Sequence, residues 1–259
     1  MKEIHSYKFE KVIELVYETK EIILNSKLRS EIHQKGQSNY VTAVDTTISS
    51  FMQTELKKLY PAIGFMSEEN NVQDMKETRW ILDPIDGTTN LIFDYQLSSV
   101  SLGLLHNDEI IFGIVYNPFT EETFYAEKGK GAYLNNKRLF VSERDISGSL
   151  IEFGAGVTQK KEADLYFQIA KEIFMDCIDI RRICSSALAI SYIAARRIDG
   201  YFEIVLKPWD YAAALLILEE AGGVVSDWNG AKMQFEKPSS IVASNKKIHN
   251  YLLSKMPQF

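Results

Sequence analysis

The chain has 259 residues, of which 46% are hydrophobic and 25% charged, an ordinary globular composition with ample material for a core. Its formal net charge of −6 argues against a surface for duplex DNA or an anionic membrane, because both favour a basic face. The two cysteines, Cys177 and Cys184, belong to no CxxC pair or Cys/His cluster, so neither a disulfide framework nor a zinc site is expected.

The N-terminal stretch is charged and amphipathic, without the apolar run of a signal peptide. No apolar run in the chain approaches the roughly eighteen residues that a membrane-spanning helix needs. We therefore predict a cytoplasmic protein with no membrane and no nucleic-acid partner.

The first half of the chain is predicted to start with helices and to continue in strands. Helical spacing of apolar residues predicts a helix over 7–28, followed by a polar loop over 28–45 and a second helix over 45–60. Residues rich in β-branched and aromatic side chains predict strands over 62–66, 79–86, 98–107, 109–118 and 122–129. A hairpin is predicted over 131–141, with Asn135 and Asn136 in its turn.

The second half alternates helices and strands. Helices are predicted over 162–176, 185–197 and 208–223, and strands over 199–206, 223–228 and 239–245. Two groups of mixed strands, each flanked by helices, predict a layered α/β architecture.

The stretch WILDPIDGTTN, residues 80–90, runs an apolar strand into two acids and a turn. Asp83 and Asp86 follow at the carboxyl end of the strand, where open α/β sheets bind ligands. With the Ile85 carbonyl they form a set of hard oxygen donors suited to Mg²⁺ or Mn²⁺. Gly87 permits close backbone approach, and free N–H groups from Thr88 onward would face an anion. For an isolated D-x-x-D-G, solvated turn acids are the simpler interpretation.

Three further acidic positions occupy similar junctions: Glu68 after a short strand, Asp45 before a helix and Asp210 between a strand and a long apolar helix. Each has a simple explanation by itself, as a helix N-cap or a surface acid. Four acidic clusters at such turns would repel one another, and divalent cations would resolve that repulsion.

With these motifs in place, the sequence resembles the inositol monophosphatase family of Mg²⁺-dependent, lithium-sensitive phosphatases. WILDPIDGTTN matches its first signature and KPWDYAAALLILEEAGG its second, while MSEEN and VTAVD match two shorter segments. The order and spacing fit from about residue 7 to 245. The resemblance implies a layered α-β-α-β-α fold of the inositol monophosphatase and fructose-1,6-bisphosphatase type. It also implies one catalytic domain over 1–259, with approximate halves 1–145 and 146–259.

The resemblance further implies hydrolysis of a small phosphate monoester by metal-activated water, without a covalent phosphoenzyme, using two or three Mg²⁺ ions that Mn²⁺ can replace. Glu68, Asp83 and the Ile85 carbonyl would hold the first ion, and Asp83, Asp86 and Asp210 the second. A third, weaker ion would lie near Glu68, which would also orient water. The Asp45–Thr88 pair would polarise the attacking water. The residues implied to face the substrate are Asp86, Gly87, Thr88, Ser186, Glu203 and Asp210.

Substrate preference is the open part of this prediction. Glu203 matches a family carboxylate that accepts sugar-ring hydroxyls, which favours inositol monophosphates and related sugar or polyol phosphates. Cys184 and Ser186 replace the glycine and alanine of the family pattern. NADP(H) 2′-phosphatase and fructose-1,6-bisphosphatase activities are therefore alternatives, since the metal core would bind the phosphate group of any of these esters and would not distinguish their alcohol parts. The Arg181–Arg182 pair would be a solvated face or would meet a second phosphate.

A 3′-phosphoadenosine phosphatase ranks lower, because that branch carries Asp-Gly-Thr-Lys-Glu where this chain has Asp-Gly-Thr-Thr-Asn. A non-catalytic phosphate- or metal-binding module would be expected to lack a ligand, and every expected acid is present. The loop around Lys35 resembles a mobile lid that contributes a lysine near the metals, and a solvated lysine is equally consistent with the sequence. The resemblance also implies a homodimer.

Overall fold

The computed structural model describes residues 9–36, 39–69, 74–156 and 159–257, and the strands of these residues form three sheets. The first is an antiparallel pair of β1 (Ile32–Gly36) and β2 (Asn39–Thr42). A seven-stranded sheet contains, in order, β3 (Gly64–Ser67), β4 (Thr78–Asp86), β5 (Ser99–His106), β6 (Glu109–Asn117), β7 (Glu122–Glu127), β8 (Gly131–Leu134) and β9 (Lys137–Arg138). A five-stranded sheet contains, in order, β11 (Asp179–Arg181), β10 (Leu150–Phe153), β12 (Gly200–Leu206), β14 (Ser239–Ser244) and β13 (Val224–Ser226).

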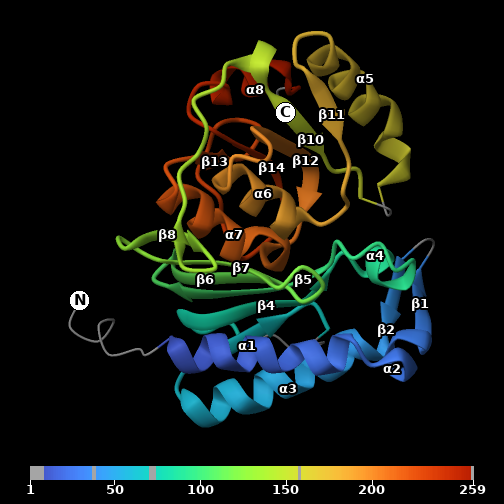
Figure 1. Cartoon of the computed structure of the whole chain (residues 1–259), viewed down its shortest axis with the longest axis vertical. Coiled ribbons are helices and arrows are strands. Elements are labelled where there is room, and N and C mark those ends of the chain that lie inside the picture. Colours follow the sequence, from blue (N-terminus) through green and yellow to red (C-terminus); the bar gives the residue numbers. More distant parts are fainter. Residues whose placement is uncertain (1–8, 37–38, 70–73, 157–158, 258–259) are drawn as a thin grey trace.

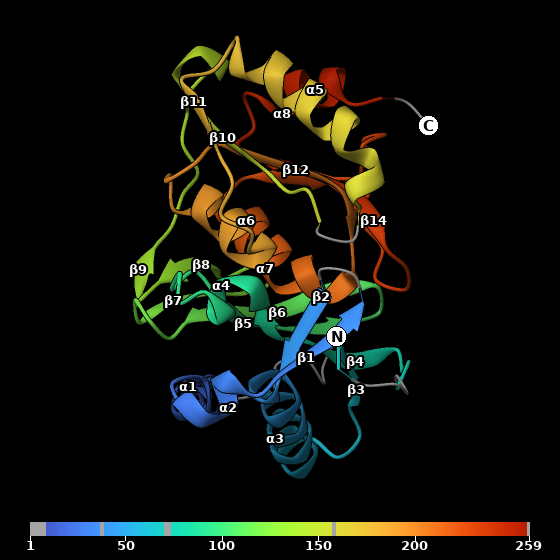
Figure 2. The ribbon, with the colours of Figure 1, turned by 90° about the vertical axis from the view of Figure 1, so that its right-hand side faces the viewer.

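Helices separate and cover the two large sheets (Figure 1). The outer face of the seven-stranded sheet carries α1 (Glu10–Ile23) and α3 (Ala43–Leu59). Between the two sheets lie α6 (Ser186–Ala194) and α7 (Pro208–Glu220), and the outer face of the five-stranded sheet carries α5 (Ala163–Phe174) and α8 (His249–Lys255) (Figure 2). This order of layers is the predicted α-β-α-β-α fold, which is confirmed. Two short helices, α2 (Ser26–Ser30) and α4 (Thr88–Ile92), and two 3₁₀ turns, η2 (Ile146–Gly148) and η3 (Lys160–Glu162), complete the description.

Each helical layer has its own apolar core. Val12 of α1 and Met52 of α3 are buried with Trp80 and Phe112 of the seven-stranded sheet. The central core gathers α6 and α7 between the two sheets, and the third core packs α5 and α8 on the outer face of the five-stranded sheet. Apolar residues on more than one face of α7 are explained by this position, because a helix between two sheets buries most of its surface.

Several local predictions are corrected by the structure. The predicted loop over 28–45 contains the β1–β2 pair. These two strands hydrogen-bond to each other, but their residues are mostly polar and do not alternate with apolar ones, so the sequence shows no strand pattern there. The second helix begins two residues early, at Ala43, because Thr42 is the N-cap and Asp45 completes its capping box. The strand β11 and the helix α8, both of which are short, were not predicted.

The predicted hairpin turn is confirmed. Asn135 and Asn136 have φ of 45° and 67°, between β8 and β9. Asparagine tolerates this left-handed region better than most residues, which is why a pair of them indicates a tight turn.

The seven-stranded sheet falls within the predicted first half of the chain, and the five-stranded sheet falls within the second. The helices α6 and α7 come from the second half but pack against both sheets. None of the described helices has the length and apolar character needed to cross a membrane.

Candidate active site

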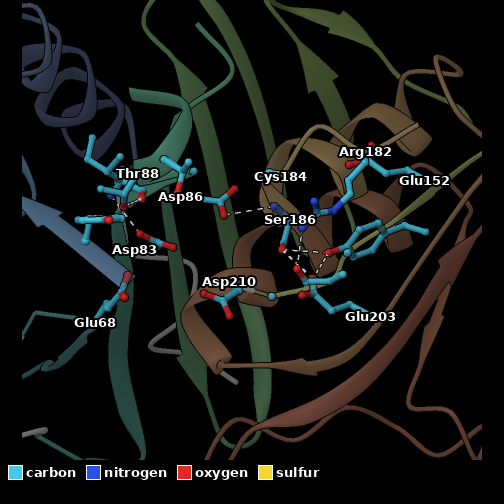
Figure 3. Close-up of a pocket in the computed structure, with 18 residues that line it drawn as sticks. Glu68, Asp83, Asp86, Thr88, Glu152, Arg182, Cys184, Ser186, Glu203 and Asp210 are labelled. Carbon is cyan, nitrogen blue, oxygen red and sulfur yellow. Dashed lines mark hydrogen bonds between the residues drawn. The ribbon is translucent and has the colours of Figure 1, made fainter. Parts of the chain in front are cut away.

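A cavity of about 330 Å³ opens where the two halves of the chain meet. It collects nine of the ten site residues predicted from the sequence, and the tenth, Asp45, contacts the cavity through Thr88. Figure 3 shows Glu68, Asp83 and Thr88 at one end, Glu152 and Arg182 at the other, and Asp86 and Asp210 between them. The nine lining residues are Glu68, Asp83, Ile85, Asp86, Gly87, Thr88, Ser186, Glu203 and Asp210.

The end of β4 places its two acids on the cavity. The pairing of β4 with β5 shifts register between Asp83 and Asp86, at the point where Pro84 removes a backbone donor. The Ile85 amide donates to Asp83 Oδ1 at 3.0 Å, which fixes that carboxyl group. Asp83 is only 2% exposed. Burial, followed by the charges of Glu68, Asp86 and Asp210, holds the pKa of Asp83 well above its ordinary value.

Asp86 connects the two halves of the chain, a role that was not predicted. Its carboxyl group accepts hydrogen bonds from the Ser185 hydroxyl, from the Ala187 amide at 2.9 Å and from the Ser186 amide at 3.2 Å. These donors belong to the start of α6, so an acid from the first half caps a helix of the second. Burial raises the pKa of Asp86 to about 6, although these hydrogen bonds pull it down.

Asp45 and Thr88 form the predicted pair. The Thr88 hydroxyl is 3.1 Å from Asp45 Oδ1 and also 3.1 Å from the Ile85 carbonyl oxygen. The second oxygen of Asp45 accepts from the Thr42 amide at 2.8 Å and from its hydroxyl at 2.6 Å. Burial raises the pKa of Asp45, and the hydrogen bonds from Thr42 oppose that rise.

Asp210 repeats this arrangement in the other half of the chain. The simpler alternative for Asp210 was an N-cap, but it is the third residue of α7, and its Oδ2 accepts from the Lys207 amide at 2.6 Å. Asp45 occupies the same position in α3. At this position the carboxylate accepts a hydrogen bond from the backbone amide of the N-cap residue, so the side chain stays near the start of the helix. Burial and the charge of Glu68 raise the pKa of Asp210.

The donor set suits a hard divalent cation, because four carboxyl groups and the Ile85 carbonyl line one cavity. The raised pKa values of Asp83 and Asp210 reflect desolvation and repulsion that a cation would relieve. In the described part of the chain, no three acidic, imidazole or thiol groups are arranged as ligands of one ion. A bound ion would therefore require the side chains to rotate toward it.

The remaining end of the cavity holds Ser186 and Glu203. The hydroxyl of Ser186 lies 3.0 Å from the Tyr201 hydroxyl and donates to Glu203 Oε2 at 3.4 Å, and Tyr201 also donates to that oxygen. Cys184 has φ of 60°, in the left-handed region where glycine is favoured. This backbone conformation explains why a glycine suits that position in the family pattern. The Lys35 side chain lies outside what the structure describes.

Among the lining residues that were not predicted as site residues are Glu152, Arg182 and Tyr201. A signal for two of them was available. Glu152 interrupts the apolar strand LIEF, and Tyr201 lies two residues before Glu203, on the same face of β12. The Arg182 guanidinium donates to the Ala155 carbonyl at 2.6 Å, so it belongs to the cavity rim rather than to a solvated helix face.

Comparison with known protein families gives a match over residues 4–258 to a family described as the inositol monophosphatase family. The Nus factor SuhB of Escherichia coli K12 is 37% identical over 229 residues, which cover 87% of this chain and 85% of that protein.

Solved structures with the same fold are also similar. An IMPase from Thermotoga maritima superposes with a TM-score of 0.88 at 29% identity, covering 95% of each chain. SaIMPase-II with inositol monophosphate bound gives a TM-score of 0.81 at 26% identity, covering 93% of this chain and 91% of its own. The same protein with 2′AMP bound also gives 0.81 at 26% identity, covering 94% of this chain and 90% of its own.

Proposed function

This chain belongs to the inositol monophosphatase family, and we propose that it is an Mg²⁺-dependent phosphomonoesterase that hydrolyses inositol monophosphates and related polyol phosphates. The observation that carries the proposal is the meeting of acids from distant parts of the chain. Glu68, Asp83 and Asp86 come from the first half, and Asp210 from the second, yet all four line one cavity. A fold without such chemistry would gain nothing from burying them together.

The proposed ligands are Glu68, Asp83 and the Ile85 carbonyl for one cation, and Asp83, Asp86 and Asp210 for a second. When bound, such cations lower the pKa of water, neutralise charge on the phosphoryl oxygens and steady the leaving group. A third ion near Glu68 remains part of the proposal, and Mn²⁺ is expected to replace Mg²⁺.

The chain's own residues would position the reactants. Thr88 and Asp45 are linked at 3.1 Å, so together they can hold the attacking water in line with the phosphorus and accept its proton. Gly87 has φ of 90°, and a Cβ there would lie 2.9 Å from the Leu97 carbonyl, so only glycine fits this turn. That turn presents the Gly87 and Thr88 amides as the proposed phosphate contacts.

The alcohol part of the ester would lie at the Ser186 and Glu203 end of the cavity. A nucleotide 2′-phosphate, including NADP, is the second candidate, because SaIMPase-II has been solved with 2′AMP as well as with inositol monophosphate. Arg182 on the rim is the observation in this chain that favours NADP, since a guanidinium can pair with the diphosphate that NADP carries besides its 2′-phosphate. The same contact would serve fructose 1,6-bisphosphate.

A substrate panel tests the proposal. The purified protein with Mg²⁺ is assayed for phosphate release from myo-inositol 1-phosphate, NADP, 2′AMP and fructose 1,6-bisphosphate. We expect the highest kcat/KM for the inositol ester, with loss of activity in EDTA and inhibition by lithium and by excess Mg²⁺. Turnover of NADP far above that of the inositol ester would reverse the order of the two candidates, and no release from any ester would refute the enzyme proposal.

Gly154→Ala is expected to weaken binding of polyol esters while leaving the fold intact. A Cβ at this position would lie 2.0 Å from Glu203 Oε2 and 2.6 Å from the Tyr201 hydroxyl, so the carboxyl group must move. Loss of its hydrogen bonds to substrate should raise KM about tenfold, since a hydrogen bond to a charged group contributes about 1.5–3 kcal/mol. Steady-state kinetics with myo-inositol 1-phosphate measure this.

Gly156→Ala is the matched control, because its Cβ would stay 3.4 Å from Glu203 Oε1. Its KM should remain within about twofold of the wild-type value. An unchanged KM in both variants would show that Glu203 does not contact the substrate.

The Escherichia coli relative is named a Nus factor, a name that does not describe ester hydrolysis. The prediction that this chain binds no nucleic acid depends on its net charge of −6 and stays a prediction. The cytoplasmic location, the homodimer and the single catalytic domain over 1–259 likewise stay predictions.

A further inference from the structure

Glu152 is a buried acid at the end of the cavity that is farthest from Glu68 (Figure 3). It comes from β10 and is 1% exposed. Its Oε1 accepts a hydrogen bond from the Ile183 amide at 3.0 Å. Its Oε2 has no hydrogen-bond partner among the described residues. A buried polar atom that lacks a hydrogen-bond partner destabilises the fold, so such an atom beside a cavity indicates that a ligand supplies its partner.

We propose that the Oε2 side of Glu152 binds a hydroxyl group on the alcohol part of a polyhydroxylated phosphate ester, which makes Glu152 a specificity-determining residue beside Glu203. This inference rests on the proposed phosphatase function and narrows its substrate class. The hydrolysis itself would use the acids at the opposite end of the cavity.

The neighbouring strand explains how Glu152 and Glu203 come to act on one ligand. Strand β10 pairs in parallel with β12, and Glu152 lies opposite Tyr201 in the register. Glu203 follows Tyr201 by two residues on β12, so its side chain leaves the sheet on the same face. Tyr201 and Ser186 already donate to Glu203 Oε2, which keeps Glu203 in the role of an acceptor.

Burial raises the pKa of Glu203 to about 7, while hydrogen bonds from Tyr201 and Ser186 favour its charged, accepting form. Burial raises the pKa of Glu152 to about 8, with Asp86 and Glu203 adding to the rise and Arg182 opposing it. Near pH 7 Glu152 is therefore mostly neutral. Because its Oε1 accepts from Ile183, the proton belongs on Oε2, which becomes a donor. One donor beside one acceptor suits a ring with several hydroxyl groups, since each hydroxyl can both give and receive a hydrogen bond.

A second phosphate would fit this end of the cavity poorly. It would bring negative charge toward Glu203 and Asp86, and Arg182 is the one cation among the described lining residues. That guanidinium already donates to the Ala155 carbonyl. The chemistry therefore favours a neutral polyol over a bisphosphate as the alcohol part.

Glu152→Met and Glu152→Gln test the inference. Methionine keeps the length of the side chain and removes both oxygens, whereas glutamine keeps an acceptor for Ile183 and a donor in place of Oε2. The measurement is the ratio of kcat/KM for myo-inositol 1-phosphate to kcat/KM for p-nitrophenyl phosphate, whose leaving group has no hydroxyl. Loss of the Ile183 contact alone would disturb both substrates alike, so the ratio isolates recognition of the alcohol.

We expect the ratio to fall at least about tenfold in Glu152→Met and to stay within about threefold of the wild-type ratio in Glu152→Gln. A ratio in Glu152→Met equal to that of the wild type would overturn the inference, as would an equal fall in both variants. If circular dichroism shows that the methionine variant is unfolded, the same ratio is measured in Glu152→Ala, which is expected to show the fall predicted for Glu152→Met. A wild-type protein that hydrolyses neither ester would refute the proposed function instead.

Discussion

Asp83→Asn should lower kcat/KM for the preferred ester by about 1000-fold or more while the protein remains folded. Asp83 is the one side chain assigned to both proposed cations, and it lies in a buried site where a missing charge is not replaced by solvent. Removing a single group that stabilises the developing charge commonly costs about 100- to 1000-fold, and here two cations would lose a ligand together. The measurement is phosphate release at saturating Mg²⁺ with the best substrate of the panel.

The fold of this variant should survive for a structural reason. Asparagine has the shape of aspartate and keeps an oxygen to accept from the Ile85 amide. Burial and four neighbouring acids disfavour the charge of Asp83, so its removal leaves the metal-free protein at least as stable in thermal unfolding. Asp164→Asn, at an exposed residue in the first turn of α5, is the matched control and should keep wild-type activity. More than a tenth of wild-type activity in Asp83→Asn would contradict the metal assignment.

Gly113→Ala should destabilise the protein by about 1–3 kcal/mol, the usual cost of overpacking, which lowers Tm by about 2–12 °C in a chain of this size. Gly113 on β6 lies opposite Gly103 on β5, and α7 crosses the sheet at this pair. A Cβ at Gly113 would lie 2.5 Å from the Ala213 carbonyl oxygen and 3.0 Å from its Cα. These are backbone atoms, so no side chain can rotate away and the helix itself must move.

The same displacement should lower activity, because α7 carries Asp210 into the cavity. Gly103→Ala should have a smaller effect, since its nearest contact would be 3.3 Å, and Gly148→Ala should be nearly neutral, with its nearest neighbour at 3.9 Å. Urea unfolding of the three variants gives their free energies of unfolding. If Gly113→Ala unfolds at the same urea concentration as Gly148→Ala, the close approach of α7 to the sheet is not a constraint on the fold.

Local patterns in the sequence were sufficient for most elements of the fold. The strands β4 to β7 and the helices α5, α6 and α7 lie within a few residues of their predicted positions, because period and turn residues are properties of neighbouring residues. The pair β1–β2 was missed because a polar strand has no such period. The start of α7 at Pro208 was predicted, but the N-cap residues Thr42 and Lys207 were not, because an aspartate at the third position of a helix resembles an N-cap in the sequence.

The residues that could perform the chemistry are identified by the sequence, because its two signature motifs contain Asp83, Asp86 and Asp210. The surroundings of these acids depend instead on tertiary contacts. Three such contacts join segments that are distant in the chain: Asp86 caps α6, Glu152 lies opposite Tyr201, and Gly113 lets α7 approach the sheet closely. Such contacts depend on which strands pair and how closely layers approach, and no local pattern of residues encodes either.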